Sequence, residues 1–210
     1  MGKVLMGEVL MDADFSIELG REDPVLDFPW KDPAGQFIYR DLKRHPELLA
    51  EIDEAEKFPE LREFLRAMNS AQSLVETAKC DVWAATELSA EEGIYDASHK
   101  CASYVDIVFS EVDVQPDVQL DAQQSLPSHE QFARKLVDLL RRAPETPSAA
   151  EVCVRRCYFT EDRGVREGFY FTLYVSGYGK DCAGARQNWG VALRLMANAV
   201  GQLSVAAMRA

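Results

Sequence analysis

Apolar residues recur at helical spacing in two stretches of the C-terminal half of the chain. From residue 128, Ser128 and Gln131 have the spacing of a capping box, and an apolar stripe follows: Phe132, Leu136, Leu139 and Leu140. A longer stripe follows Asp181 at alternating steps of four and three residues: Trp189, Leu193, Met196, Val200, Leu203 and Ala207. The pattern predicts one helix over 128–142 and another from about Asp181.

In the N-terminal third, proline interrupts the helical pattern. Residues 34–69 contain prolines at positions 46 and 59, and proline fits the first turn of a helix but breaks its interior. We therefore expect an N-terminal helical segment made of short helices. A short strand from Asp14 to Leu19 is expected before it.

Alternation of apolar and polar residues predicts four strands, over 74–87, 101–109, 151–160 and 168–178. The first two can pair as a hairpin, and the last two can pair across a turn from Glu161 to Gly164. The register of this second hairpin is left open. A further strand is expected from Val112 to Leu120.

These elements indicate an α+β fold with a predominantly antiparallel sheet. It is built from two hairpin–helix units, 74–142 and 151–207, with the helices on one face. We expect a single domain over 1–210, in which 1–70 form a strand plus helical annex and 74–210 form the sheet–helix core. The order of elements is similar to that of the duplicated effector-binding domains of the GyrI-like class, which implies a fold and not a function.

One face of the predicted sheet is unusually aromatic. In a one-sided antiparallel sheet the outer face is polar, yet here it carries the candidate ligand-binding residues Trp83, Tyr104, Tyr170, Tyr174, Asp81 and Asp106. Aromatic surface of this extent is seldom left to solvent. We consider three alternative covers for this surface: the helices of 34–69, a second copy of the chain, or a small ligand.

Two arginines and two aspartates raise further alternatives. In either register of the second hairpin, Arg155 or Arg156 must point toward the aliphatic face, where it pairs with a carboxylate, reaches out at the sheet edge, or anchors an anionic group of a ligand. We take Arg156 as the candidate. If Asp81 or Asp106 is covered, its pKa would rise and it could act as a base, which is the enzymatic alternative.

Composition narrows the class of partner. The chain has 210 residues, 47% of them hydrophobic, and a formal charge of -12, which disfavours binding to nucleic acids and to anionic membranes. Its start lacks the features of a signal peptide, and no window reaches the roughly 18 apolar residues of a membrane span. Five scattered cysteines favour a reducing cytoplasm.

Motifs for metal, cofactor or nucleophile chemistry are not found. Cys153 and Cys157 share one predicted strand, which puts them about 13 Å apart, too far to share an ion. Each histidine, including His129, is expected to be a surface or capping residue. Gly177 and Gly179 are expected to form a sharp turn before the last helix, with Asp181 as its cap.

The sequence therefore predicts a non-catalytic module that binds a small apolar or cationic molecule on the aromatic face, without a metal or cofactor. The alternatives are a homodimeric interaction or structural protein that buries this face, and an enzyme that uses one of its aspartates.

Overall fold

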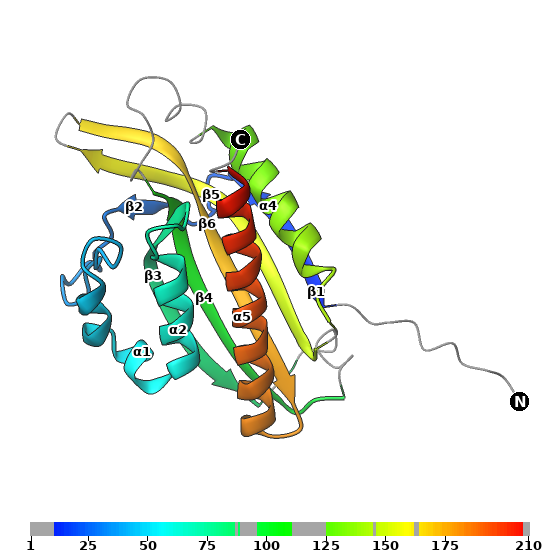
Figure 1. Ribbon diagram of the computed structural model, residues 1–210. Coiled ribbons are helices and arrows are strands. Elements are labelled where there is room, and N and C mark those ends of the chain that lie inside the picture. The colour runs from blue at the N-terminus through cyan, green and yellow to red at the C-terminus, as the bar shows by residue number, and fades with distance from the viewer. Residues whose placement is uncertain are drawn as a thin grey trace, which may run out of the picture.

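The computed structural model describes residues 11–86, 88, 96–110, 125–144, 146–161 and 164–207. In this part of the chain, mixed α and β elements form a six-stranded sheet and five helices (Figure 1). The strands are β1 (Asp12–Glu18), β2 (Leu26–Phe28), β3 (Val75–Ala85), β4 (His99–Phe109), β5 (Ser148–Glu161) and β6 (Gly164–Gly179). The helices are η1 (Pro46–Glu51), α1 (Asp53–Lys57), α2 (Pro59–Met68), α4 (Leu126–Leu140) and α5 (Cys182–Ala207).

The four strands and two long helices predicted from periodicity are confirmed as β3, β4, β5, β6, α4 and α5. Ser125, rather than Ser128, caps α4, because its side chain accepts a hydrogen bond from the Ser128 amide. The strand expected over Val112 to Leu120, and the middle of the turn after Glu161, lie outside the described residues.

The sheet is mixed. Its strand order is β1-β5-β6-β4-β3, and β2 also pairs with β5. The pairs β3·β4, β4·β6 and β5·β6 are antiparallel, whereas β1 and β2 run parallel to β5. Both parallel pairs are formed by an N-terminal strand with β5, the strand that lies next to the edge of the sheet.

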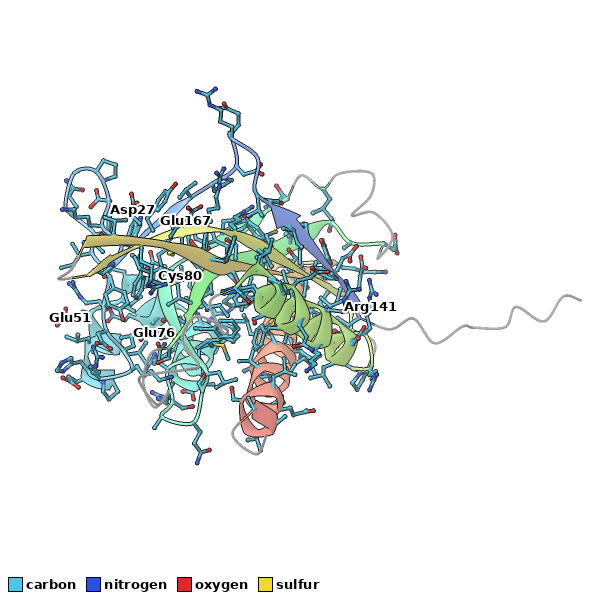
Figure 2. The ribbon with its side chains drawn as sticks, turned by 90° about the horizontal axis from the view of Figure 1, so that it is seen from above. Asp27, Glu51, Glu76, Cys80, Arg141 and Glu167 are labelled. Atoms are coloured by element: carbon cyan, nitrogen blue, oxygen red, sulfur yellow. The ribbon has the colours of Figure 1, made fainter. Side chains whose placement is uncertain are left out.

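Helices α2, α4 and α5 lie on the same side of the sheet (Figures 1 and 2). The core between the layers joins strand residues such as Val152 and Leu173 to the α5 stripe, in which Trp189, Leu193 and Met196 are buried. The predicted stripe of the last helix therefore faces the sheet. Side-chain burial of this kind supplies most of the stability of such a layer.

Two glycines bring α5 close to the sheet. Gly177 and Gly179 lie inside β6, and a Cβ atom at Gly177 would meet the Trp189 nitrogen at 2.0 Å and the Ala185 oxygen at 2.5 Å. The sharp turn expected at these glycines is wrong, because both residues lie inside β6. Their lack of a side chain instead permits close packing of the helix on the strand. The cap was predicted correctly: the Gly184 amide donates to Asp181 Oδ1 at 2.7 Å.

The opposite face of the sheet has a second, smaller core. It contains buried residues from five strands: Leu26, Ala78, Val108, Cys157, Phe159 and Tyr170. Phe28 and Trp30 pack against this cluster. The chain after β1 thus passes to the far side of the sheet and covers one end of it, while the helices cover the other side.

By length and composition, α5 could cross a membrane, since it has 26 residues and contains an 18-residue window with a mean hydropathy of 1.2. Its large apolar side chains are instead packed against the sheet, as is typical of the core helix of a globular domain. The cytoplasmic location inferred from composition stays a prediction.

Candidate functional site

Three of the predicted aromatic residues form a ladder across neighbouring strands, which we call the aromatic face: Trp83 on β3, Tyr104 on β4 and Tyr174 on β6. The ring centroids of Trp83 and Tyr104 are 6.5 Å apart, and those of Tyr104 and Tyr174 are 6.3 Å apart. Tyr104 and Tyr174 are direct cross-strand partners. Trp83 is 39% exposed and both tyrosines are half-buried, so the face is accessible.

Tyr170 is not part of this ladder. It is only 2% exposed and belongs to the small core that β2 and Trp30 cover. Of the helices of 34–69, α2 does not cover this face, because it packs against α5 and β3 in the main core, and only the η1–α1 turn lies beside Asp81 and Tyr104. The extended segment before these helices covers part of the face instead, and it leaves the aromatic face open.

Beneath the aromatic rings, charged and polar side chains form a row across five strands. Arg155 Nε donates to Glu18 Oε2 at 2.7 Å, and its Nη1 donates to Thr172 Oγ1 at 2.9 Å. Thr172 in turn donates to Asp106 Oδ1 at 2.6 Å, and the other oxygen of Asp106 lies 3.5 Å from Lys79 Nζ. This charged row satisfies polar groups that would otherwise be buried at a cost.

Asp106 is the buried centre of the row, with 2% of its surface exposed. Burial raises the pKa of its carboxyl, and the Thr172 hydrogen bond and the Lys79 charge oppose that rise. Both carboxylate oxygens already face a donor. Asp106 therefore acts as a counter-ion beneath the surface, whereas Asp81 is exposed and accepts a hydrogen bond from the Val82 amide.

The two adjacent arginines have different places. Arg156 pairs in register with Phe169, and its Nη2 donates to the Gly20 carbonyl, so it lies apart from the aromatic face. Arg155 lies on the aromatic side of the sheet, opposite to the aliphatic face that we assigned to Arg156: its Nη1 lies 3.3 Å from the Tyr174 hydroxyl, and its guanidinium lies 5.6 Å from that ring centroid. It supports the aromatic face from below.

A groove runs along the outer edge of β3 and opens beside Tyr104. It has a volume of about 410 Å³. Its walls come from the segment after β2, the η1–α1 turn, β3 and β4: Trp30, Gln36, Phe37, Ile38, Arg40, Glu51, Ile52, Asp53, Glu54, Ala78, Lys79, Cys80, Asp81 and Tyr104. The ammonium of Lys79 lies 5.5 Å from the ring centroids of both Trp30 and Tyr104. The predicted residues Asp81 and Tyr104, together with Lys79, thus line the same groove as the segment after β2. The sequence offers no reason to place that segment beside them.

The rim of the groove is acidic. Its two cations are already engaged: Arg40 forms a 2.9 Å ion pair with Glu51, and Lys79 pairs with Asp106. Within the described parts of the chain, Asp53, Glu54 and Asp81 form no ion pair. The opening therefore presents negative charge beside aromatic rings.

Sequence reasoning missed the contribution of the segment from Trp30 to Arg40. Phe37 is 61% exposed and Ile38 is 51% exposed, and both line the groove. The only indication in the sequence was an aromatic, proline-rich stretch without helical or strand periodicity. Such a pattern does not say which part of the sheet the segment will reach.

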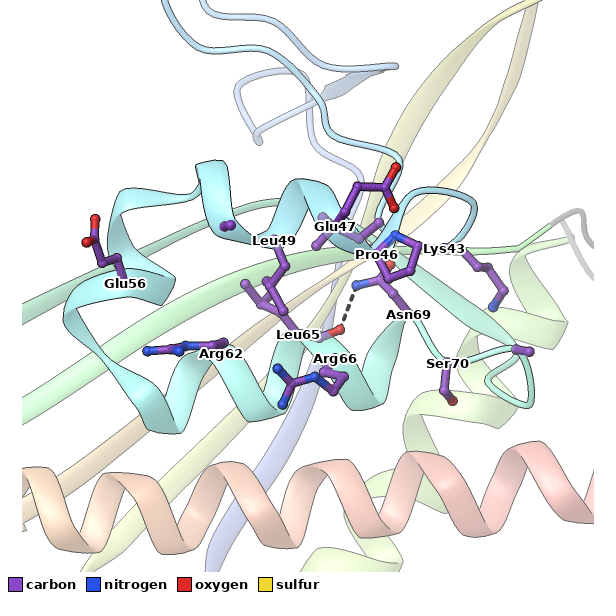
Figure 3. A pocket seen from close by; sticks show the side chains of 13 residues that line it. Lys43, Pro46, Glu47, Leu49, Glu56, Arg62, Leu65, Arg66, Asn69 and Ser70 are labelled. Atoms are coloured by element: carbon purple, nitrogen blue, oxygen red, sulfur yellow. Dashed lines mark hydrogen bonds between the residues drawn. The ribbon is translucent and has the colours of Figure 1, made fainter.

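A larger pocket, of about 640 Å³, lies between η1 and α2 and contains none of the predicted residues (Figure 3). Its polar groups serve the fold: Arg62 Nε donates to the Ala55 carbonyl, and Asn69 Nδ2 donates to the Leu65 carbonyl. Lys43 Nζ donates to the Val75 carbonyl. Because these groups hold the segment to α2 and β3, the pocket is a weaker candidate than the groove.

Among the residues that the structure describes, one cluster has ligand atoms close enough for a metal ion, namely Glu18, Glu151 and Cys153, whose ligand atoms lie within 4.8 Å of one another. Glu18 is already bonded to Arg155. Burial raises the pKa of the Cys153 thiol to about 12, so a metal ion would have to displace this proton as well as the Arg155 contact of Glu18. These properties do not fit a metal centre.

Comparisons with protein-family models, with curated proteins and with solved structures find no match for the chain. The similarity of its element order to the GyrI-like class therefore stays a prediction about the fold. The groove and the aromatic face are the basis for assigning a function.

Proposed function

We propose that the protein is a non-catalytic binding module, and that the groove with the adjoining aromatic face takes a small molecule with an apolar body and a positive charge. The observation that carries this proposal is the junction of the two features at Tyr104, which lines the groove and stands in the middle of the ladder.

The apolar part of the ligand has a ready surface. Phe37 and Ile38 on one wall, and Trp83 beyond the opening, are among the exposed large hydrophobic residues of the described chain. Flat aromatic surface buries much area at little entropic cost, because tyrosine and tryptophan have few rotatable bonds. A ligand of modest size would cover this surface.

The positive charge of the ligand is favoured by the acidic rim. Asp53, Glu54 and Asp81 surround the opening, and aromatic faces attract cations through their quadrupoles. Lys79 already shows this geometry, with its ammonium near two rings and a carboxylate. An anionic ligand would meet repulsion from the rim and from the net charge of -12.

Catalysis by an aspartate receives less support. Asp106 is buried and faces Thr172 and Lys79, so no reactant could approach it without disrupting the charged row. Asp81 is exposed, and among the described residues its hydrogen bond is to the Val82 amide, so no contact with a second acid or base orients it for catalysis. We therefore assign these side chains to structure and to charge complementarity.

The proposal is tested with three probes that share a phenyl ring and differ in charge, benzyltrimethylammonium, benzyl alcohol and benzoate, measured by calorimetry and by the rise in Tm. We expect the ammonium probe to bind most tightly and benzoate least, because a ligand selective for the folded state raises Tm. Equal affinity for the three probes, or no binding of the ammonium, would contradict the proposal.

Two variants locate the binding. Asp81→Asn removes one rim charge and Tyr104→Leu removes the central ring, and each should weaken the ammonium probe by about fivefold, corresponding to about 1 kcal/mol. The matched controls are Asp138→Asn, on an exposed position of α4, and Tyr158→Leu, a half-buried position of β5. Neither control residue lines the groove, so both should bind as the unchanged protein does.

A homodimer that buries the aromatic face is the competing interpretation. It predicts a dimer in sedimentation equilibrium at micromolar concentration that dissociates when Trp83 is changed to serine. We expect a monomer, because two copies of the acidic rim would repel one another.

We also propose, as the finer description of the fold, one domain made of two hairpin–helix units. Support comes from the succession of β3, β4 and α4, and then of β5, β6 and α5. The N-terminal helical segment of η1, α1 and α2 would be the annex that closes one wall of the groove.

A further inference from the structure

The outer edge of β3 is divided into a sealed half and an open half. β3 forms one edge of the described sheet, and an edge strand directs every second amide and carbonyl away from its neighbour. In the first half these groups are capped. The Thr77 amide donates to Asn69 Oδ1 at 3.0 Å, and Lys43 Nζ donates to the Val75 carbonyl at 3.0 Å. Just before the strand, the Leu74 amide donates to Ser204 Oγ at 3.0 Å.

A bulge separates the two halves. The register with β4 shifts between Thr77 and Lys79, so that Ala78 is an extra residue. Bulges bend and twist a strand and often occur beside functional sites. Beyond this bulge the strand continues in regular register with β4 from Lys79 to Ala85.

The second half of the edge has a different environment. Asp81, Trp83 and Ala84 are exposed, and the Val82 amide donates to the side chain of Asp81, its own neighbour, at 2.7 Å. In the described residues we see no cap from another element on the edge between Cys80 and Ala85. A stretch of about six residues, roughly 20 Å long, is therefore able to pair with an added strand.

The groove lies at the start of this open stretch. Cys80 and Asp81 belong both to the open edge and to the wall of the groove, whose opposite wall carries Asp53 and Glu54. A chain segment paired with β3 would therefore place a side chain in the groove and another beside Trp83. The charge of the rim would favour lysine or arginine at the first of these positions.

We propose that this open edge, from Cys80 to Ala85, is a docking site for an extended, lysine- or arginine-containing segment of another protein, bound by strand addition. The inference deepens the proposed function, on which it rests: the cationic group in the groove belongs to a peptide. A second copy of this chain is a poor occupant, because pairing two β3 edges would bring Asp81 and the acidic rims of both copies together.

The test uses a short synthetic peptide of alternating lysine and valine or threonine residues, with blocked ends, and the same peptide with its central amides N-methylated. Methylation removes the main-chain donors and keeps every side chain and charge. We expect the unmodified peptide to bind at least about tenfold more tightly than the methylated one, because several strand hydrogen bonds are lost together.

Two variants examine the protein side of the pairing. Val82→Pro removes the outward amide and should weaken the unmodified peptide by about tenfold, whereas Val82→Thr keeps the amide and should bind normally. Circular dichroism checks that the proline variant is folded. The comparison of the two peptides on the unchanged protein stands even if that variant does not fold.

The outcomes separate this inference from the proposed function. If benzyltrimethylammonium binds in an Asp81-dependent way but N-methylation does not weaken the peptide, the groove binds small cations and strand addition is wrong. If the peptide binds in a methylation-dependent way and the ammonium probe does not bind, the edge is used and the small-molecule proposal is wrong. A dimer that Val82→Pro abolishes would show that the edge pairs with a second copy, which overturns the inference.

Discussion

At the scale of single residues, the burial of His129 should make the free energy of unfolding depend on the ionisation of its ring. It was expected at the surface or as a cap, but it is 1% exposed at the start of α4, where Nδ1 lies 3.0 Å from the Ser125 carbonyl. Its ring stacks on Phe171 with the centroids 4.9 Å apart. Burial lowers the pKa of His129 to about 4, although the hydrogen bond to Ser125 opposes this.

A histidine whose pKa is lowered on folding stabilises the protein fully above its unfolded pKa of 6.5, and this contribution is lost as the pH falls toward 4. The free energy of unfolding should therefore drop by about 3 kcal/mol over this window. Urea denaturation of the protein and of His129→Phe from pH 7 to pH 4 measures the difference. The variant should lack this part of the decline; identical curves would mean that His129 is not responsible.

Residue patterns predicted the aromatic face but not the side chains beneath it. Alternation placed Trp83, Tyr104 and Tyr174 on one side, because the period of a strand is fixed. It could not choose between Arg155 and Arg156, since a shift of one residue in register exchanges their faces. Only the observed pairing of Arg155 with Tyr170 settles which arginine joins the charged row.

At the scale of elements, the contact between α5 and β6 depends on Gly177. A Cβ atom there would overlap the backbone of α5 at Trp189 and Ala185, and neither the helix nor the strand can move without disturbing the core. We expect Gly177→Ala to lower the free energy of unfolding by about 3 kcal/mol.

The matched control is Gly201→Ala in the same helix, where nothing lies within 4 Å of the added Cβ atom. It should stabilise the protein by about 0.5–1 kcal/mol, because alanine has the higher helix propensity. Urea midpoints with unchanged slopes give both values. A mild effect of Gly177→Ala would show that α5 does not approach β6 this closely.

Elements with a clear period were predictable from the sequence, whereas their spatial order was not. The stripe from Trp189 to Val200 fixes a helix and its buried side through local spacing. The parallel pairing of β1 and β2 with β5 depends on contacts between residues more than a hundred positions apart. Short strands without strong alternation, such as Leu26–Phe28, carry no sequence mark of their partner.

At the scale of the whole molecule, the two sides of the sheet carry different kinds of side chain. One side carries the helices and the main core, and the other carries the aromatic face and the charged row. A net charge of -12 favours a positively charged partner, which stays a prediction. Composition could not predict the groove, because the walls come from residues 30–54 and 78–104, which meet only in the folded chain.

The most direct test of binding at this site uses the three tryptophans, whose indole N–H groups give separate NMR signals. Trp30 lines the groove and Trp83 belongs to the aromatic face, whereas Trp189 is buried on the other side, with its Nε1 donating to Ser103 Oγ at 2.9 Å. On titration with benzyltrimethylammonium, we predict that the Trp30 and Trp83 signals shift in a saturable way while the Trp189 signal stays in place. A saturable shift of Trp189 alone, or no shift of Trp30 and Trp83, would contradict a cation-binding site at the groove and the aromatic face.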